Sequence, residues 1–183
     1  MAKGSNSAAD DPYDQCFSGG CIDNLSAHIG HLDRSLKKSS GTGLFDWINE
    51  RSEDVEVTTA DLLDENQRFG VLSHGMQPDP IFNYGNKASL ELFGYEIKDL
   101  CRTASRLSTV PELMKDRETL IKEIESRGYG YISDAVRVKS DGELFVIDRI
   151  LVWTVFDDAG RRIGLAAVYD RENARSYVAP TYQ

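Results

Sequence analysis

The stretch 81–94 changes its hydrophobic period half-way, which predicts a short strand that runs directly into a helix. Phe82 and Tyr84 favour extended backbone, and two nearby prolines keep the residues before them out of helix. From Ala88 the apolar residues recur at about 3.6 positions, as on one face of a helix, and Gly94 is a suitable helix stop. We expect the rest of the chain to be arranged around this unit.

Alternating apolar residues and turn signals predict four further strands. They cover 71–73, 129–139, 143–156 and 162–170, and the last three are joined by short Asp- and Gly-containing turns. Together with 81–84 they predict an α+β fold with a PAS-like five-stranded antiparallel sheet, helices on one face and preceding N-terminal helices.

The strand over 143–156 is apolar on both sides, so we expect it at the centre of the sheet. Strict alternation places Leu144, Val146, Ile150 and Val152 on one side and Phe145, Ile147, Leu151, Trp153 and Val155 on the other. Asp148 and Arg149 interrupt these sides, and a buried charge needs a partner. Candidates are Arg106 or Arg137 for Asp148, and Asp134 or a ligand carboxylate for Arg149.

The segment from Ile22 to Leu36 has an apolar seam with heptad spacing, formed by Ile22, Leu25, Ile29, Leu32 and Leu36. A helix this short needs a packing partner. Two partners are consistent with the pattern: the chain's own domain, or the same helix of a second subunit, which would make a homodimer. His28 and His31 on this helix lack further ligands at metal-binding spacing, and we interpret them as surface histidines.

These elements divide the chain into four parts. We predict a disordered N-terminus over 1–20, an N-terminal helical extension over 21–70, the PAS-like domain over 71–170 and a loose C-terminal tail over 171–183.

Composition narrows the possible functions. The 183 residues include 40% hydrophobic and 28% charged residues, as in an ordinary soluble protein, and the net charge is −9. An acidic chain without a basic stripe is a poor direct partner for nucleic acid. The sequence contains neither an apolar run long enough to cross a membrane nor a secretion signal, so we expect no membrane partner and an intracellular, cytoplasmic location.

Candidate catalytic residues are few. His74 is the one histidine of the predicted domain, and no nucleophile or phosphate-binding loop accompanies it. We therefore expect no catalysis and no metal site. The alternative is a small enzyme of isomerase or lyase type that uses His74 and Asp148 in a pocket between sheet and helices.

The segment from Val71 to Phe93 (V-L-S-H-G-M-Q-P-D-P-I-F-N-Y-G-N-K-A-S-L-E-L-F) resembles the opening of a MEKHLA domain. S-R-L-S over 105–108 and later blocks up to about Tyr169 follow that family's order, with departures at Thr103-Ala104 and Thr154. The family is PAS-like and occurs at the C-terminus of plant class III homeodomain–leucine zipper transcription factors and as stand-alone proteins. The resemblance implies the stand-alone form, without a homeodomain, and a sensory or regulatory role.

We therefore predict a sensory or regulatory module that binds a small molecule or a partner protein, both unidentified. The cofactor stays open, because Cys101-Arg102 lacks the surrounding residues of a flavin-binding LOV domain and the helices after Tyr84 contain no His. The predicted ligand-binding residues lie around the strand-to-helix unit and the long strand: His74, Asn83, Tyr84, Asn86, Arg106, Arg149 and Trp153.

Overall fold

The computed structural model describes residues 22–53, 56–110 and 117–178. The helices are α1 (Leu25–Ser40), α2 (Leu44–Asn49), α3 (Ala60–Asp64), α4 (Lys87–Phe93), α5 (Ile97–Leu100) and α6 (Arg117–Arg127), with short 3-10 turns η1 (Ser105–Ser108) and η3 (Arg171–Asn173). The strands are β1 (Phe69–His74), β2 (Phe82–Gly85), β3 (Tyr129–Val138), β4 (Leu144–Phe156), β5 (Arg162–Asp170) and β6 (Ala174–Ser176). The segment 1–20, predicted to be disordered, lies outside the described residues.

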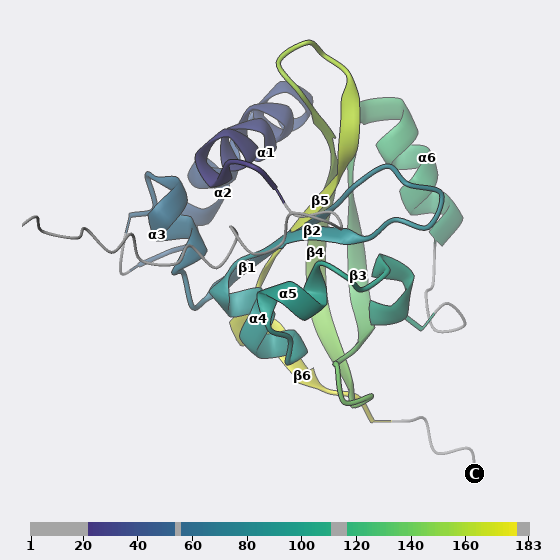
Figure 1. Ribbon diagram of the computed structural model, residues 1–183. Helices are drawn as coiled ribbons and strands as arrows, with labels where there is room; N and C mark the ends of the chain where they lie inside the picture. The colour runs from purple at the N-terminus through teal and green to yellow at the C-terminus, as the bar shows by residue number, and fades with distance from the viewer. Residues whose placement is uncertain (1–21, 54–55, 111–116, 179–183) are drawn as a thin grey trace, which may run out of the picture.

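The strands form one antiparallel sheet in the order β2-β1-β5-β4-β3 (Figure 1). The α+β, PAS-like architecture is thereby confirmed, and each of the five predicted strands is present. A sixth strand, β6, pairs with the first part of β4, at Phe145 to Ile147. It lies in the tail that we predicted to be loose, so that part of the prediction is wrong: backbone pairing orders residues whose sequence shows no strand pattern.

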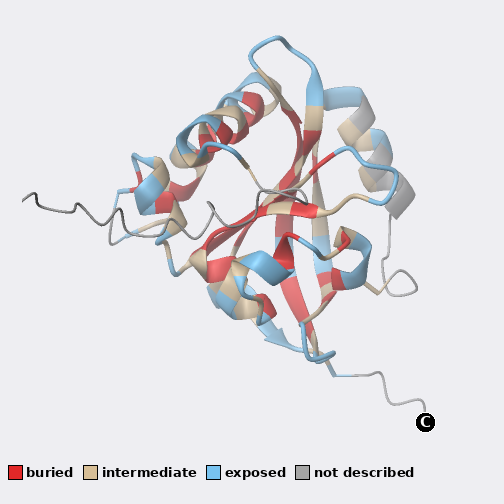
Figure 2. Cartoon of the chain, viewed as in Figure 1, coloured by how far each residue is buried: buried red, intermediate tan, exposed pale blue. Residues whose placement is uncertain are grey.

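Helices cover both faces of the sheet. Side chains of α4 and α5, which lie between β2 and β3, pack with Phe82, Phe145 and Tyr169 on one face of the sheet. We call this the inner face. The prediction of helices on one face holds for this segment. The N-terminal helices α1, α2 and α3 pack on the opposite, outer face. The buried residues accordingly follow the central strands and the helix sides turned toward them (Figure 2).

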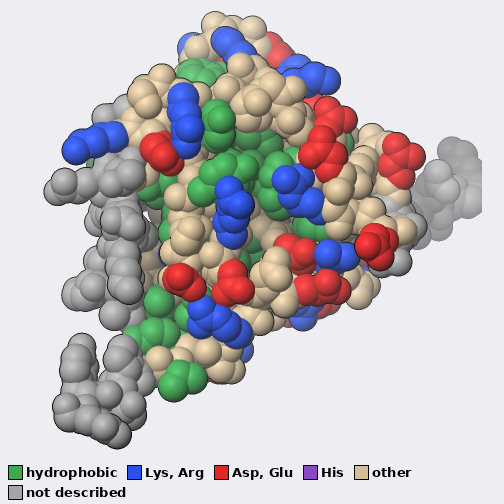
Figure 3. Space-filling view, turned by 180° about the vertical axis from the view of Figure 1, so that it is seen from behind, with side chains coloured by type: hydrophobic (Ala, Val, Ile, Leu, Met, Phe, Trp, Pro, Cys, Tyr) green, Lys and Arg blue, Asp and Glu red, His purple; other side chains and the backbone are tan. Residues whose placement is uncertain are grey.

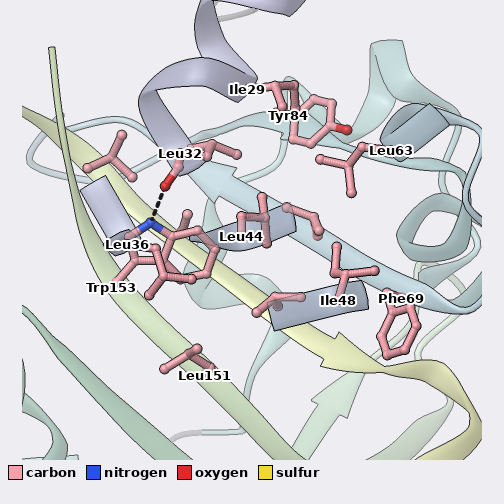
Figure 4. Packing of buried hydrophobic residues seen from close by; sticks show 14 of the residues in the cluster. Ile29, Leu32, Leu36, Leu44, Ile48, Leu63, Phe69, Tyr84, Leu151 and Trp153 are labelled. Carbon is pink, nitrogen blue, oxygen red and sulfur yellow. Dashed lines mark hydrogen bonds between the residues drawn. The ribbon is translucent and has the colours of Figure 1, made fainter. Parts of the chain in front are cut away.

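The seam of α1 packs against the chain's own sheet. Ile29, Leu32 and Leu36 are at most 1% exposed and lie in the outer-face cluster with Trp153, whose indole Nε1 donates to the Leu32 carbonyl at 3.1 Å (Figure 4). Asn24 caps the start of the helix by accepting from the Ala27 amide, and Gly41 ends it in the left-handed conformation. This packing favours the first alternative for the seam. Homodimerisation through the helix stays a prediction.

Strand β4 does not keep one alternation along its length. Phe145 and Ile147 belong to the inner-face cluster together with Ile150 and Val152, whereas strict alternation predicted opposite sides. The reversal falls at Asp148 and Arg149, opposite Asp134 of β3, which has φ 49°. A non-glycine residue in this left-handed region changes the direction of the strand locally, and no sequence period reports it.

The two charged residues of β4 are exposed and have other partners than predicted. Asp148 accepts from Arg175 of β6 at 3.0 Å, and the same guanidinium binds Asp134 at 2.7 Å. Arg149 lies over the Tyr131 ring, 4.0 Å from its centroid. The expectation of buried charges on β4 is wrong because the reversal turns both side chains toward solvent. Within the described ranges, no helix is long and apolar enough to cross a membrane.

Candidate functional site

The inner face is lined by aromatic and aliphatic side chains from both the sheet and the helices. Phe93 of α4 makes edge contacts with Phe145 of β4 and Tyr169 of β5, at centroid distances of 5.0 and 6.4 Å. Leu72, Phe82, Leu100, Ile147, Ile150 and Val152 complete the buried cluster. Such apolar surroundings make any polar group placed there costly unless it is hydrogen-bonded.

A short chain of hydrogen bonds crosses the inner face, and each hydroxyl in it has a partner within the protein. The Ser89 hydroxyl donates to the Val71 carbonyl at 3.0 Å, so the Tyr169 hydroxyl, 2.9 Å from Ser89 Oγ, is the donor in that pair. Burial raises the pKa of Tyr169 above its ordinary value. The phenol therefore stays neutral and fixes α4 against β1 and β5.

Arg137 of β3 brings a charge into the same region. It is opposite Phe145 in the ladder with β4 and only 8% exposed. Its Nη1 donates to the adjacent Val136 carbonyl at 3.2 Å. Burial lowers the pKa of Arg137 to about 10, which still leaves it charged at neutral pH.

Asn86 is the best-connected of the residues predicted from sequence. Its side-chain oxygen accepts from the amides of Val71 and Ser89 at 2.8 and 3.3 Å, and its nitrogen donates to the carbonyls of Leu63 and Phe69 at 3.0 and 2.8 Å. The residue is 0% exposed. It caps α4 as predicted, and it also ties α4 to α3 and β1.

A second polar chain lies on the outer face, under α1. The Ser73 hydroxyl donates to Asn83 Oδ1 at 2.6 Å, so it accepts from His28 Nε2, 2.8 Å away. His28 is 9% exposed, and burial, helped by the positive field of His31, lowers its pKa to about 4. The interpretation of His28 as a surface histidine is therefore wrong, because its partner Ser73 is distant in sequence.

Two more predicted residues, Tyr84 and Trp153, also pack on the outer face and are 0% exposed. Burial, followed by the charge of Asp64 and a hydrogen bond to it, raises the pKa of Tyr84. Their place beneath the N-terminal helices puts them on the opposite side of the sheet from Arg137.

Two further predicted residues are on the surface. Arg106 pairs with Asp79 at 2.9 Å, and Arg149 stacks on Tyr131. On the face seen from behind, hydrophobic side chains gather near the centre, and basic side chains are interspersed with acidic ones rather than aligned in a stripe (Figure 3).

His74 is half-buried at the end of β1. Its Nδ1 is 2.9 Å from the Gly75 carbonyl, its ring meets Phe82 edge-on, and burial lowers its pKa. His74 pairs with Leu165, and Leu165 pairs with Thr154 of β4. Asp148 is six positions from Thr154 on that strand, or about 20 Å at roughly 3.3 Å per residue. The structure does not bring His74 and Asp148 together.

A surface hollow lies elsewhere, between α3, α4 and α5, and contains none of the predicted residues. Three of its charged groups are in ion pairs: Lys87 with Glu65 at 3.0 Å, and Glu91 with Arg171 at 2.6 Å. Among the residues that the structure describes, no group of three or more His, Cys, Asp or Glu side chains is placed to hold a metal ion.

The sequence was compared with the sequence models of known protein families. The sequence model of the MEKHLA domain matches residues 26–173. The chain belongs to the MEKHLA domain family. The matched range starts inside α1, so the family's pattern includes the N-terminal helices that cover the outer face of the MEKHLA sheet. No curated protein sequence shows a significant match.

Solved structures similar to this MEKHLA chain are PAS and light-oxygen-voltage domains. A PAS domain of a protein from Colwellia psychrerythraea is 18% identical, with 72% of this chain and 98% of that chain covered and a TM-score of 0.44. A light-oxygen-voltage domain studied with a flavin analogue is also 18% identical, with 62% and 78% covered and a TM-score of 0.45. The Aureochrome1 light-oxygen-voltage domain is 20% identical, with 65% and 86% covered and a TM-score of 0.45.

Sequence reasoning missed two features of the inner face of the MEKHLA domain. From the sequence, Tyr169 marks only the end of the resemblance to the family, and Arg137 is only a salt-bridge candidate for Asp148. The local signal for Arg137 pointed the wrong way: alternation with Val136 and Val138 predicts valines that face a core and an arginine that faces solvent. Which side is the core depends on the reversal at Asp134, and the sequence does not show that reversal.

Proposed function

We propose that this MEKHLA domain is a sensory or regulatory module that binds a small ligand on the inner face of its sheet and does not catalyse a reaction. Membership of a PAS-like family supports the sensory role. The observation that carries the ligand-binding part is Arg137, a buried charge among apolar side chains whose guanidinium is mostly unused by the described chain. Buried charges that the fold itself does not neutralise are typical of functional sites.

The separation of His74 and Asp148 counts against the enzyme alternative. A general acid and a general base must both reach the same substrate within hydrogen-bonding distance. About 20 Å of strand separates them, and Asp148 already accepts from Arg175. We therefore keep the non-catalytic module as the proposed function.

Native mass spectrometry of the chain purified under non-denaturing conditions tests the proposal. We expect a bound small molecule at a fixed ratio to protein, lost on denaturation, and an absorbance spectrum would identify a coloured cofactor. A preparation free of any bound or bindable small molecule would contradict ligand sensing. Turnover of a substrate that disappears in both His74→Ala and Asp148→Asn would instead establish the enzyme.

A further inference from the structure

Most N–H donors of the Arg137 guanidinium have no acceptor among the described residues. An arginine side chain offers five N–H donors, and the single bond described uses one Nη1 hydrogen to the Val136 carbonyl at 3.2 Å. Among the carboxylates whose side chains the structure describes, none forms an ion pair with it, although it is only 8% exposed. An isolated buried charge of this kind is expensive.

Nearby acids exist, but each is engaged elsewhere. Asp134 and Asp148 both bind Arg175, at 2.7 and 3.0 Å, and Glu143 binds Lys139 at 2.6 Å. Three surface acids of the β3–β4 hairpin are thus in ion pairs, while the buried Arg137 has no counter-charge among them. This pattern is the reverse of what stability favours, since breaking up a buried pair costs far more than losing a surface pair.

The surroundings of Arg137 define what could neutralise it. Of the buried polar side chains in the described part of the chain, it alone carries a permanent charge, and its neighbour across the ladder is Phe145. One fixed positive charge matches one negative charge, and the planar fork matches a carboxylate with two parallel hydrogen bonds. A phosphate dianion would need a second buried cation, which the described inner face does not supply.

Arg137 lies close to the edge of the sheet. Arg137 is one residue from the end of β3, the edge strand, and Thr109, directly after η1, forms an isolated bridge opposite it. The S-R-L-S motif therefore runs beside Arg137. Its own arginine, Arg106, is exposed and bound to Asp79, which leaves Arg137 as the charge turned inward.

We propose that Arg137 binds the carboxylate of a small monocarboxylate whose apolar body packs beside Phe145, and that this molecule is the ligand of the module. The proposal rests on the proposed function and names its ligand class. Burial lowers the pKa of Arg137, and a bound carboxylate would reverse that effect, so the pair would stabilise the folded chain.

The test uses the full chain and matched charged and neutral probes: sodium octanoate and benzoate against octanol and benzyl alcohol. We expect the carboxylates to raise the melting temperature and to bind in calorimetry, and the alcohols to bind at least tenfold more weakly. Arg137→Gln should weaken carboxylate binding at least tenfold. Arg162→Gln, the same change at an exposed arginine of β5, should leave it unchanged.

Arg137→Met, which replaces the charge by an apolar chain, serves the same purpose if the glutamine variant does not fold. Equal binding of alcohols and carboxylates, equal carboxylate binding by wild type and the Arg137 variants, or no carboxylate binding at all would overturn the proposal. A neutral or cationic molecule found by native mass spectrometry would also overturn it while leaving the sensory function standing.

Discussion

Replacing Asn86 by alanine tests whether this residue is a helix cap or the joint of three elements. The side chain makes four hydrogen bonds to backbone groups of α3, β1 and α4, and it is 0% exposed. If Asn86 were only a cap, the loss of unfolding free energy would be about 1 kcal/mol. Four buried bonds at about 1 kcal/mol each give about 4 kcal/mol, because the carbonyls of Leu63 and Phe69 would lose their donor and the Val71 amide its acceptor.

Asn24→Ala is the matched control, because Asn24 caps α1 through one bond to the Ala27 amide and is exposed. Urea unfolding of both variants gives the comparison. We expect Asn24→Ala to lose about 1 kcal/mol and Asn86→Ala about 3 kcal/mol more. At a slope of about 2 kcal/mol per molar urea, Asn86→Ala lowers the midpoint by about 2 M. Equal losses for the two variants would refute the reasoning.

Three further changes have expected outcomes. Trp153→Ala should cost roughly 3–5 kcal/mol in urea unfolding, because the indole is 0% exposed; a loss under about 1 kcal/mol would contradict this packing. His28 has a folded pKa of about 4 against an ordinary 6.5, so the unfolded chain takes up the proton first as pH falls. Stability should therefore drop on the order of 3 kcal/mol from pH 6.5 to 4, and His28→Gln should remove this dependence in a pH series of melts. Sedimentation tests the homodimer: a dimeric wild type would support it, and a monomeric wild type would contradict it. Ile29→Glu should destabilise the folded chain by several kcal/mol in either case, because Ile29 is 1% exposed against its own sheet.

The sequence predicted the strands of this domain well, and the reason is local. The hairpins of β3, β4 and β5 have strong alternation and Gly-containing turns, and β5 was placed at 162–170 as observed. The cap at Asn86 was also predicted, because capping depends on residues three positions apart.

What the sequence did not predict depends on contacts between distant residues. Opposite Asp134, the faces to which alternate side chains of β4 point are exchanged. Asp134 has φ 49°, and no residue pattern around it predicts this backbone conformation. Burial of His28 depends on Ser73, 45 positions away, and β6 is a strand only because β4 offers it a free edge. For the same reason the sequence could not place Arg137 on the inner face or show that its guanidinium lacks a counter-charge.

The bond from Trp153 to the Leu32 carbonyl joins residues 121 positions apart, and this spacing has a consequence for synthesis. Ribosomes add about 5–20 residues per second, so α1 is made roughly 6–24 s before the strand that covers it. During that time its apolar stripe can pack on α2 and α3 but lacks β4 and β5, and closing so long a loop is also slow in refolding. The nascent chain is therefore most open to aggregation or chaperone binding through α1, until the last strands of the sheet are complete.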